Sequence, residues 1–126
     1  MSKLSRADLV WNRAFEGGSD NPRGGDEAFA ALLIFHAVTF EYGVPYAVGY
    51  LDIDDRNRAK LGYNYFRIRP AVKLLIQLEK MTQDELILNE VLLNTQYEQI
   101  IPDYAYLENI LKSYLSANPF EFAPCK

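Results

Sequence analysis

The stretch DEAFAALLIFHAVTFEY, residues 26–42, decides the fold of this chain. Apolar side chains occur around most of its helical circumference and leave little room for a polar face. A helix of this kind is normally buried on several sides. Gly43 follows directly and is suited to end the helix, because glycine readily adopts the left-handed backbone that closes many helices. We therefore predict a central, buried helix from Asp26 to Tyr42.

Helical spacing of apolar residues continues on both sides of this segment. Ser5 and Thr82 indicate two helix starts, because the side-chain oxygen of each can accept a hydrogen bond from the free N–H groups of a first helical turn. The run VPYAVGYL at 44–51 is either a short helix or an extended turn. No run alternates apolar and polar residues as a half-buried strand does. We predict an all-α fold, a compact bundle of about six helices, in which the central helix is joined by helices near residues 5–15, 52–65, 70–81, 82–95 and 103–118.

Two of these helices carry specific expectations about burial. In the central helix, Ile34 and Phe40 are counted among the apolar positions of the core. The helix at 82–95 is expected to bury one apolar side, formed by Leu86, Leu88, Val91 and Leu92, with Leu93 as a further candidate.

Length and composition indicate one domain. The chain has 126 residues, 49% of them apolar and 13% aromatic, which excludes disorder as a description of the whole. A single cysteine excludes an internal disulfide. The longest apolar run, residues 29–35, is far shorter than the roughly 20 residues that span a bilayer. We expect one soluble cytoplasmic domain over residues 1–126, with an exposed loop at 16–25 and a C-terminal tail at 119–126.

The formal net charge of −4 conceals a pattern along the chain. Residues 1–55 carry a net charge of −5, residues 56–82 carry +6, and residues 83–126 carry −5. Such blocks can mark a binding surface. The first interpretation is that acidic neighbours neutralise the basic middle within the fold, and the second is that the basic middle faces a partner.

The residue types needed for catalysis or metal binding are scarce. His36 is the only histidine and Cys125 the only cysteine, so no Cys–His pair or multi-histidine site can be assembled. We therefore predict no catalytic residue, no metal site and no cofactor. His36 is expected to be a core histidine held by one hydrogen bond. A small enzyme built around His36 and Glu41 is a third-ranked alternative.

The order of the helices resembles the DNA-mimic-protein family, a group of small bacterial α-helical domains. The similar parts are the segment AALLIFHAVTFEY (residues 30–42) followed by a glycine turn, and the closing helix and tail over residues 104–122. The turn itself differs from the family's usual Asn-Gly-Gly-aromatic-x-Gln, since EYGVPY stands in its place. The resemblance implies a non-catalytic role, in which acidic side chains imitate DNA phosphates and occupy a DNA-binding protein.

We therefore expect a non-catalytic bacterial protein-binding domain, either a DNA mimic or a partner of the immunity or antitoxin type. It would be a monomer or homodimer, would not contact a membrane, and would meet a basic or DNA-binding protein through acidic C-terminal helices, where complementary charge speeds association. The expected partner-binding residues are Asp84, Glu85, Glu90, Glu98, Asp103 and Glu108. The alternative is a nucleic-acid-binding module, which would use Arg56, Arg58, Lys60, Arg67 and Arg69.

Overall fold

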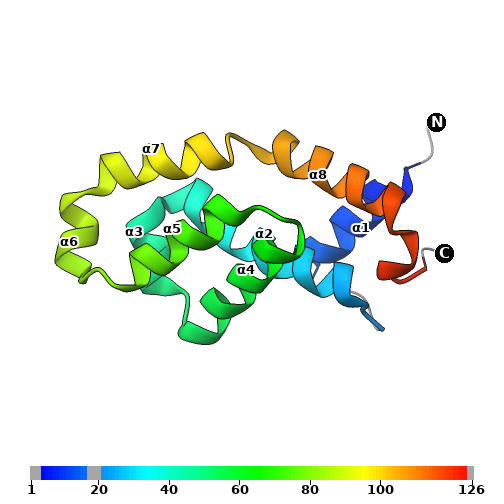
Figure 1. Cartoon of the computed structure of the whole chain (residues 1–126), viewed down its shortest axis with the longest axis horizontal. Coiled ribbons are helices and arrows are strands. Elements are labelled where there is room, and N and C mark those ends of the chain that lie inside the picture. The colour runs from blue at the N-terminus through cyan, green and yellow to red at the C-terminus, as the bar shows by residue number, and fades with distance from the viewer. Residues whose placement is uncertain (1–3, 17–20, 125–126) are drawn as a thin grey trace.

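Helix α2 (Gly24–Tyr42) runs through the middle of the molecule and packs against α1, α3 and α4 (Figure 1). The structure is a computed structural model that describes residues 4–16 and 21–124. The side chains of Phe29, Leu32 and Phe35 are fully buried. The predicted central helix is thus confirmed, although it begins two residues earlier than expected. Ile34 and Phe40 are exposed, contrary to the prediction, because the neighbouring helices leave part of its circumference uncovered.

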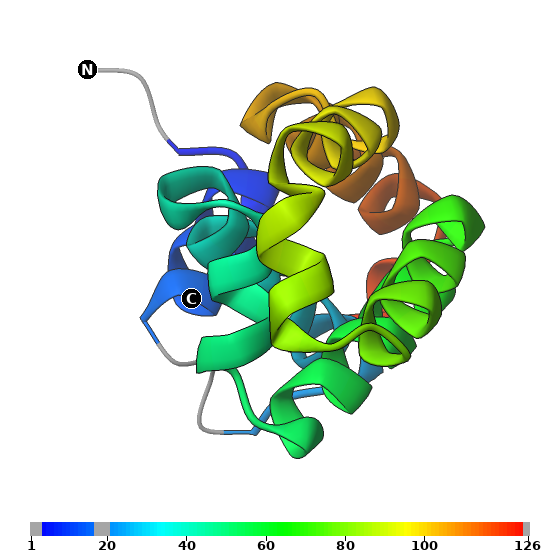
Figure 2. The same ribbon diagram turned by 90° about the vertical axis from the view of Figure 1, so that its left-hand side faces the viewer.

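The described residues contain helices and no strand, which confirms the all-α class. Helices α7 and α8 follow one another along one long side of the molecule, and α6 lies at the end opposite α1 (Figure 1). Viewed from the α6 end, α6 lies between α3 and α5 (Figure 2). The elements besides α2 are α1 (Arg6–Phe15), α3 (Val44–Tyr50), α4 (Ile53–Tyr65), α5 (Arg69–Glu79), α6 (Gln83–Leu88), α7 (Glu90–Ile100), α8 (Tyr104–Ala117) and the 3-10 helix η1 (Pro119–Glu121).

The structure has more helices than the predicted six, for two reasons. The ambiguous run after Gly43 forms α3, whose first turn accepts Pro45 because the first helical N–H groups need no partner within the helix. The single helix predicted at 82–95 is divided at Asn89 into α6 and α7. The division changes burial: Leu86 and Leu93 are in the core, whereas Leu88, Val91 and Leu92 are exposed, so the predicted apolar side is wrong at those three positions.

Most helix starts follow the predicted capping. Ser5 and Asp8 exchange hydrogen bonds across the first turn of α1, and Thr82 and Glu85 do the same in α6. Asp52 caps α4 by accepting from the N–H of Asp55. These contacts span three residues each, which is why the sequence shows them.

Asp26 is not the N-cap residue of α2, which is Arg23, but lies in the first turn and joins three parts of the chain. Its carboxylate accepts from the backbone N–H of Arg23 at 3.0 Å and from the N–H of Ala123 at 2.7 Å. It also pairs with the Arg13 guanidinium of α1 at 2.7 Å. The carboxylate is almost fully buried, and its three partners fasten α1 and the C-terminal tail to the start of α2.

The two expected irregular segments are borne out only in part. Residues 17–20 of the predicted loop lie outside the described residues, while Gly24 and Gly25 already belong to α2. In the tail, Phe122 is buried against the bundle and Phe120 is exposed. Cys125 lies outside the described residues. Among those that are described, no helix is long and apolar enough to cross a membrane.

Candidate functional site

The six acidic residues predicted to bind a partner are spread over α6, α7 and α8, and they differ in what their carboxylates do. Those of Glu85 and Asp103 accept backbone N–H groups at helix starts. Glu108 pairs with Lys112 at 2.9 Å. The remaining three are exposed and form no hydrogen bond or ion pair with any other described residue; they are Asp84, Glu90 and Glu98.

Along the chain between Asp84 and Glu98 lie four exposed apolar side chains, three of which (Leu88, Val91 and Leu92) were predicted to lie in the core. At the corner where α6 meets α7, Leu88 is 85% exposed and Val91 is 81% exposed. Ile87 and Leu92 are each 56% exposed. We call these four residues the apolar corner. Contiguous exposed apolar side chains with a polar rim are typical of protein interaction sites.

The basic segment is partly neutralised within the fold. Arg56 and Lys60 of α4 both bind the Glu79 carboxylate at the end of α5. Arg56 also donates to the carbonyl oxygens of Val48 and Leu51, which end α3. Burial raises the pKa of Glu79, but the hydrogen bonds and charges of Lys60 and Arg56 lower it more, so its pKa lies below the ordinary value.

The other three basic residues of the nucleic-acid alternative are exposed. Arg58 lines a groove between α2 and α4, and its contact with Asp55 at 3.5 Å is a surface pair. Arg67 has a positive φ of 62° in the turn before α5 and lines a different hollow, against α8. Arg69 is the first residue of α5. The structure therefore leaves three of the five basic residues available, on parts of the surface that face different hollows.

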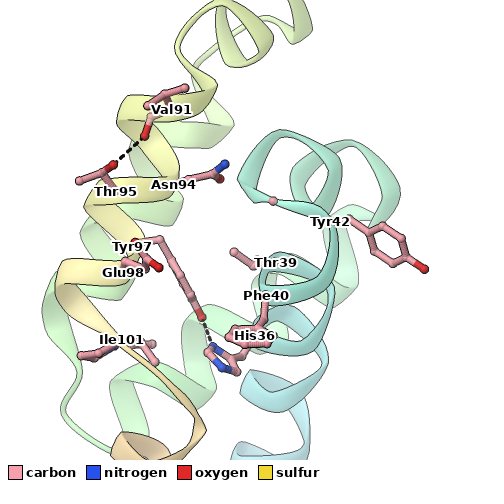
Figure 3. Close-up of a pocket in the computed structure, with 12 residues that line it drawn as sticks. His36, Thr39, Phe40, Tyr42, Val91, Asn94, Thr95, Tyr97, Glu98 and Ile101 are labelled. Carbon is pink, nitrogen blue, oxygen red and sulfur yellow. Dashed lines mark hydrogen bonds between the residues drawn. The ribbon is translucent and has the colours of Figure 1, made fainter.

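A pocket of about 420 Å³ lies behind the apolar corner, between the C-terminal half of α2 and α7 (Figure 3). Val91, Thr95 and Glu98 line it from α7, and His36, Thr39 and Phe40 line it from α2. Ile101 and Pro102 close one end. The volume is in the range of pockets that hold small organic molecules.

Three buried side chains form a hydrogen-bonded chain that ends in this pocket. The hydroxyl of Tyr63 lies 2.7 Å from that of Tyr97. The Tyr97 hydroxyl in turn lies 2.8 Å from Nδ1 of His36 (Figure 3). The Tyr63 hydroxyl has no other hydrogen-bond partner among the described residues, so its proton is satisfied only if Tyr63 donates to Tyr97. Tyr97 then donates to Nδ1, and the imidazole carries its own proton on Nε2.

The imidazole is neutral at ordinary pH. His36 is 1% exposed, and burial lowers its pKa to about 4, with the Asp103 carboxylate opposing the shift. The expected core histidine with one hydrogen bond is what the structure contains. Glu41, the carboxylate of the enzyme alternative, is exposed and forms no hydrogen bond with His36.

Two buried polar atoms of the pocket wall have no hydrogen-bond partner among the described residues: Nε2 of His36 and Oγ1 of Thr39. Thr39 is 6% exposed. By contrast, the hydroxyl of Thr95 donates to the carbonyl of Val91 at 2.9 Å (Figure 3). An unpaired buried polar group costs about 1–3 kcal/mol, so two in one wall are unusual.

Sequence reasoning missed most of these features. Thr39 and Tyr97 carry no local signal of a pocket, because their neighbours there come from other helices. The exposed tyrosines Tyr42, Tyr46 and Tyr50, whose neighbouring rings lie 4.7 and 5.4 Å apart, were also missed, although their spacing of four residues is a readable signal. Within residues 4–16 and 21–124, no three His, Cys, Asp or Glu side chains are grouped so that they could hold a metal ion.

Comparison of the chain with family models, with curated proteins and with solved structures gave no match.

Proposed function

We propose that this protein is a non-catalytic protein-binding domain that uses the apolar corner and its acidic rim as the interface. The observation that carries the proposal is the exposure of Leu88 and Val91 between the exposed carboxylates of Asp84, Glu90 and Glu98. The occupant is a protein with an apolar patch bordered by lysine or arginine, the complement of this surface in both polarity and charge.

The two parts of the interface have different roles. Burial of apolar surface stabilises a complex by roughly 25 cal/mol per Å², so the corner supplies affinity. The carboxylates lie around it, where charge mainly accelerates association and discriminates between partners. A bacterial cytoplasmic partner that itself binds DNA is the case suggested by the resemblance to DNA-mimic proteins. The apolar corner would add an apolar contact, which a surface that only imitates DNA phosphates does not need.

The test is a comparison of matched variants. Leu88→Ser with Val91→Ser removes the apolar corner, and Leu61→Ser is the control, because Leu61 is 70% exposed on α4, away from the corner. Affinity capture from a bacterial lysate, quantified by mass spectrometry, should yield a basic protein that the double variant loses and the control retains. With that protein purified, Asp84→Asn, Glu90→Gln and Glu98→Gln together should lower the association rate and weaken its dependence on salt.

Two results contradict the proposal. One is that all three baits capture the same proteins in the same amounts. The other is that sedimentation shows a dimer of the wild-type protein which the double variant abolishes, since a second copy would then occupy the corner. The nucleic-acid alternative has a separate test: binding of DNA at low salt that falls steeply as salt rises and is lost when Arg58, Arg67 and Arg69 are replaced by glutamine.

A further inference from the structure

We propose that the pocket between α2 and α7 is a binding site for a small uncharged aromatic molecule that carries a hydrogen-bond acceptor, such as an aromatic amide. The pocket adjoins the proposed partner surface, and Val91 and Glu98 belong to both.

The first argument is the direction of the proton chain. With Tyr63 as the donor to Tyr97, which is the arrangement that gives its buried proton an acceptor, Tyr97 donates to Nδ1 of His36 and the imidazole presents Nε2–H as a donor. This donor has no acceptor among the described residues. The ring of Tyr104 meets the imidazole at right angles, with centroids 4.6 Å apart, but an N–H directed at a ring is a weak substitute for a carbonyl acceptor. A carbonyl oxygen of a ligand would supply the acceptor that Nε2–H of His36 lacks.

The second argument is independent of the first and rests on Thr39. Its hydroxyl is buried one helical turn from His36, lines the same pocket and also has no partner among the described residues. A hydroxyl can both donate and accept, so it can serve the carbonyl or the N–H₂ of an amide. The amide group of one ligand would thus provide hydrogen-bond partners for both Nε2 of His36 and Oγ1 of Thr39.

The third argument concerns charge and shape. Among the described residues that line this pocket, Glu98 is the only charged side chain, and none is a lysine or arginine. The neutral imidazole of His36 does not attract an anion, and the carboxylate of Glu98 repels one. Phe40, Ile101 and Pro102 provide an apolar surface that suits a flat ring.

The experiment uses two probes of nearly the same shape, benzamide and benzoate, titrated into the wild-type protein and followed by nuclear magnetic resonance. Benzamide should shift the signals of His36 and Thr39 and show contacts with Phe40 and Ile101. Benzoate should bind at least tenfold more weakly, because it is repelled by Glu98. Replacing Glu98 by glutamine should reduce that difference.

The matched variants are Thr39→Val and Thr95→Val. Both residues line the pocket, but only Thr39 has an unpaired hydroxyl, so Thr39→Val should weaken benzamide binding about tenfold and Thr95→Val should leave it unchanged. The proposal is overturned if wild-type protein shows no shift with benzamide up to its solubility limit. It is also overturned if both variants bind as wild type does, or if benzoate binds as well as benzamide. Because the contacts of benzamide with Phe40 and Ile101 are measured in the wild-type protein, they do not depend on the folding of any variant.

Discussion

Tyr97 holds the middle position in a chain of three buried polar side chains, and this position makes it more important than its neighbour Tyr63. The Tyr97 hydroxyl both accepts from Tyr63 and donates to Nδ1 of His36. Burial raises the pKa of Tyr97 far above its ordinary value, and the adjacent Tyr63 raises it further, so the hydroxyl keeps its proton.

The two tyrosines therefore predict unequal effects when their hydroxyls are removed. Tyr97→Phe leaves both the Tyr63 hydroxyl and Nδ1 without a partner and should lower the free energy of unfolding by about 2–4 kcal/mol. Tyr63→Phe removes only a terminal donor and should cost about 0.5–1.5 kcal/mol. Urea unfolding followed by the fluorescence of Trp11 measures both. Equal costs would mean that the chain of donors runs in the opposite direction.

The histidine itself was predictable, but its partner was not. His36 lies within an apolar helix, which indicates burial, and a buried imidazole needs a hydrogen bond. Tyr97 is 61 positions away in sequence, and no spacing rule connects residues so far apart.

At the scale of the helix, the largest difference from prediction is at α6 and α7. The pattern from Thr82 to Thr95 contains a capping box and repeated leucines, which together predict one amphipathic helix. In the structure Leu86 and Leu93, two turns apart, are the apolar residues that the core covers, and the helix is interrupted at Asn89. The spacing of apolar residues shows that a segment is helical. It does not show how much of the helix circumference the neighbouring helices will cover.

Gly62 in α4 gives a second case, in which propensity and packing oppose each other. Alanine is favoured over glycine in a helix by about 1 kcal/mol, so propensity alone predicts that Gly62→Ala is stabilising. A Cβ atom at Gly62 would clash with the carbonyl oxygen of Ala28 in α2, and backbone cannot move aside easily. We expect Gly62→Ala to destabilise the protein by about 1–3 kcal/mol, because α4 would be forced away from α2.

Gly49 in α3 is the matched control for this substitution. A Cβ atom there meets only the end of the Gln83 side chain, at 3.2 Å, and that end can rotate away. Gly49→Ala should be neutral or stabilising by about 0.5–1 kcal/mol. Thermal or urea unfolding of the two variants measures the contrast, and similar effects at both positions would show that α2 and α4 are not in close contact.

At the scale of the whole molecule, the ion pairs among the described residues lie mostly within the charge blocks rather than between them. Glu79 neutralises Arg56 and Lys60, and Asp26 neutralises Arg13. Glu79 belongs to the basic segment itself, so these pairs do not show the flanking acidic segments neutralising it. Arg58, Arg67 and Arg69 remain at the surface.

The stability of the whole molecule should fall in acid because of His36. Its pKa is about 4 in the folded protein and about 6.5 in the unfolded chain, so between these values the unfolded state binds more protons. Stability from this group is complete above pH 6.5 and is lost as the pH falls to 4, by about 2–3 kcal/mol. The charged groups near the imidazole are Asp103, which raises its pKa, and Glu98, which lines the same pocket.

His36→Gln isolates this contribution, because glutamine does not titrate and the carboxylates are common to both proteins. Unfolding free energies measured between pH 4 and pH 7 should decline more steeply for the wild type than for the variant. Parallel profiles would show that the imidazole is not buried in its neutral form.

The sequence by itself determined the helical class, the central position of α2 and most helix starts, because caps, prolines and apolar spacing act over a few residues. Only the tertiary structure decided which faces are covered and which polar groups meet. The Asp26 carboxylate binds the N–H of Ala123, 97 positions away, and the pocket is formed by α2 and α7. These outcomes depend on how helices lie relative to one another, which is set by packing of the whole core. For that reason apolar residues expected in the core are exposed on α6 and α7, and the predicted core histidine lines a pocket.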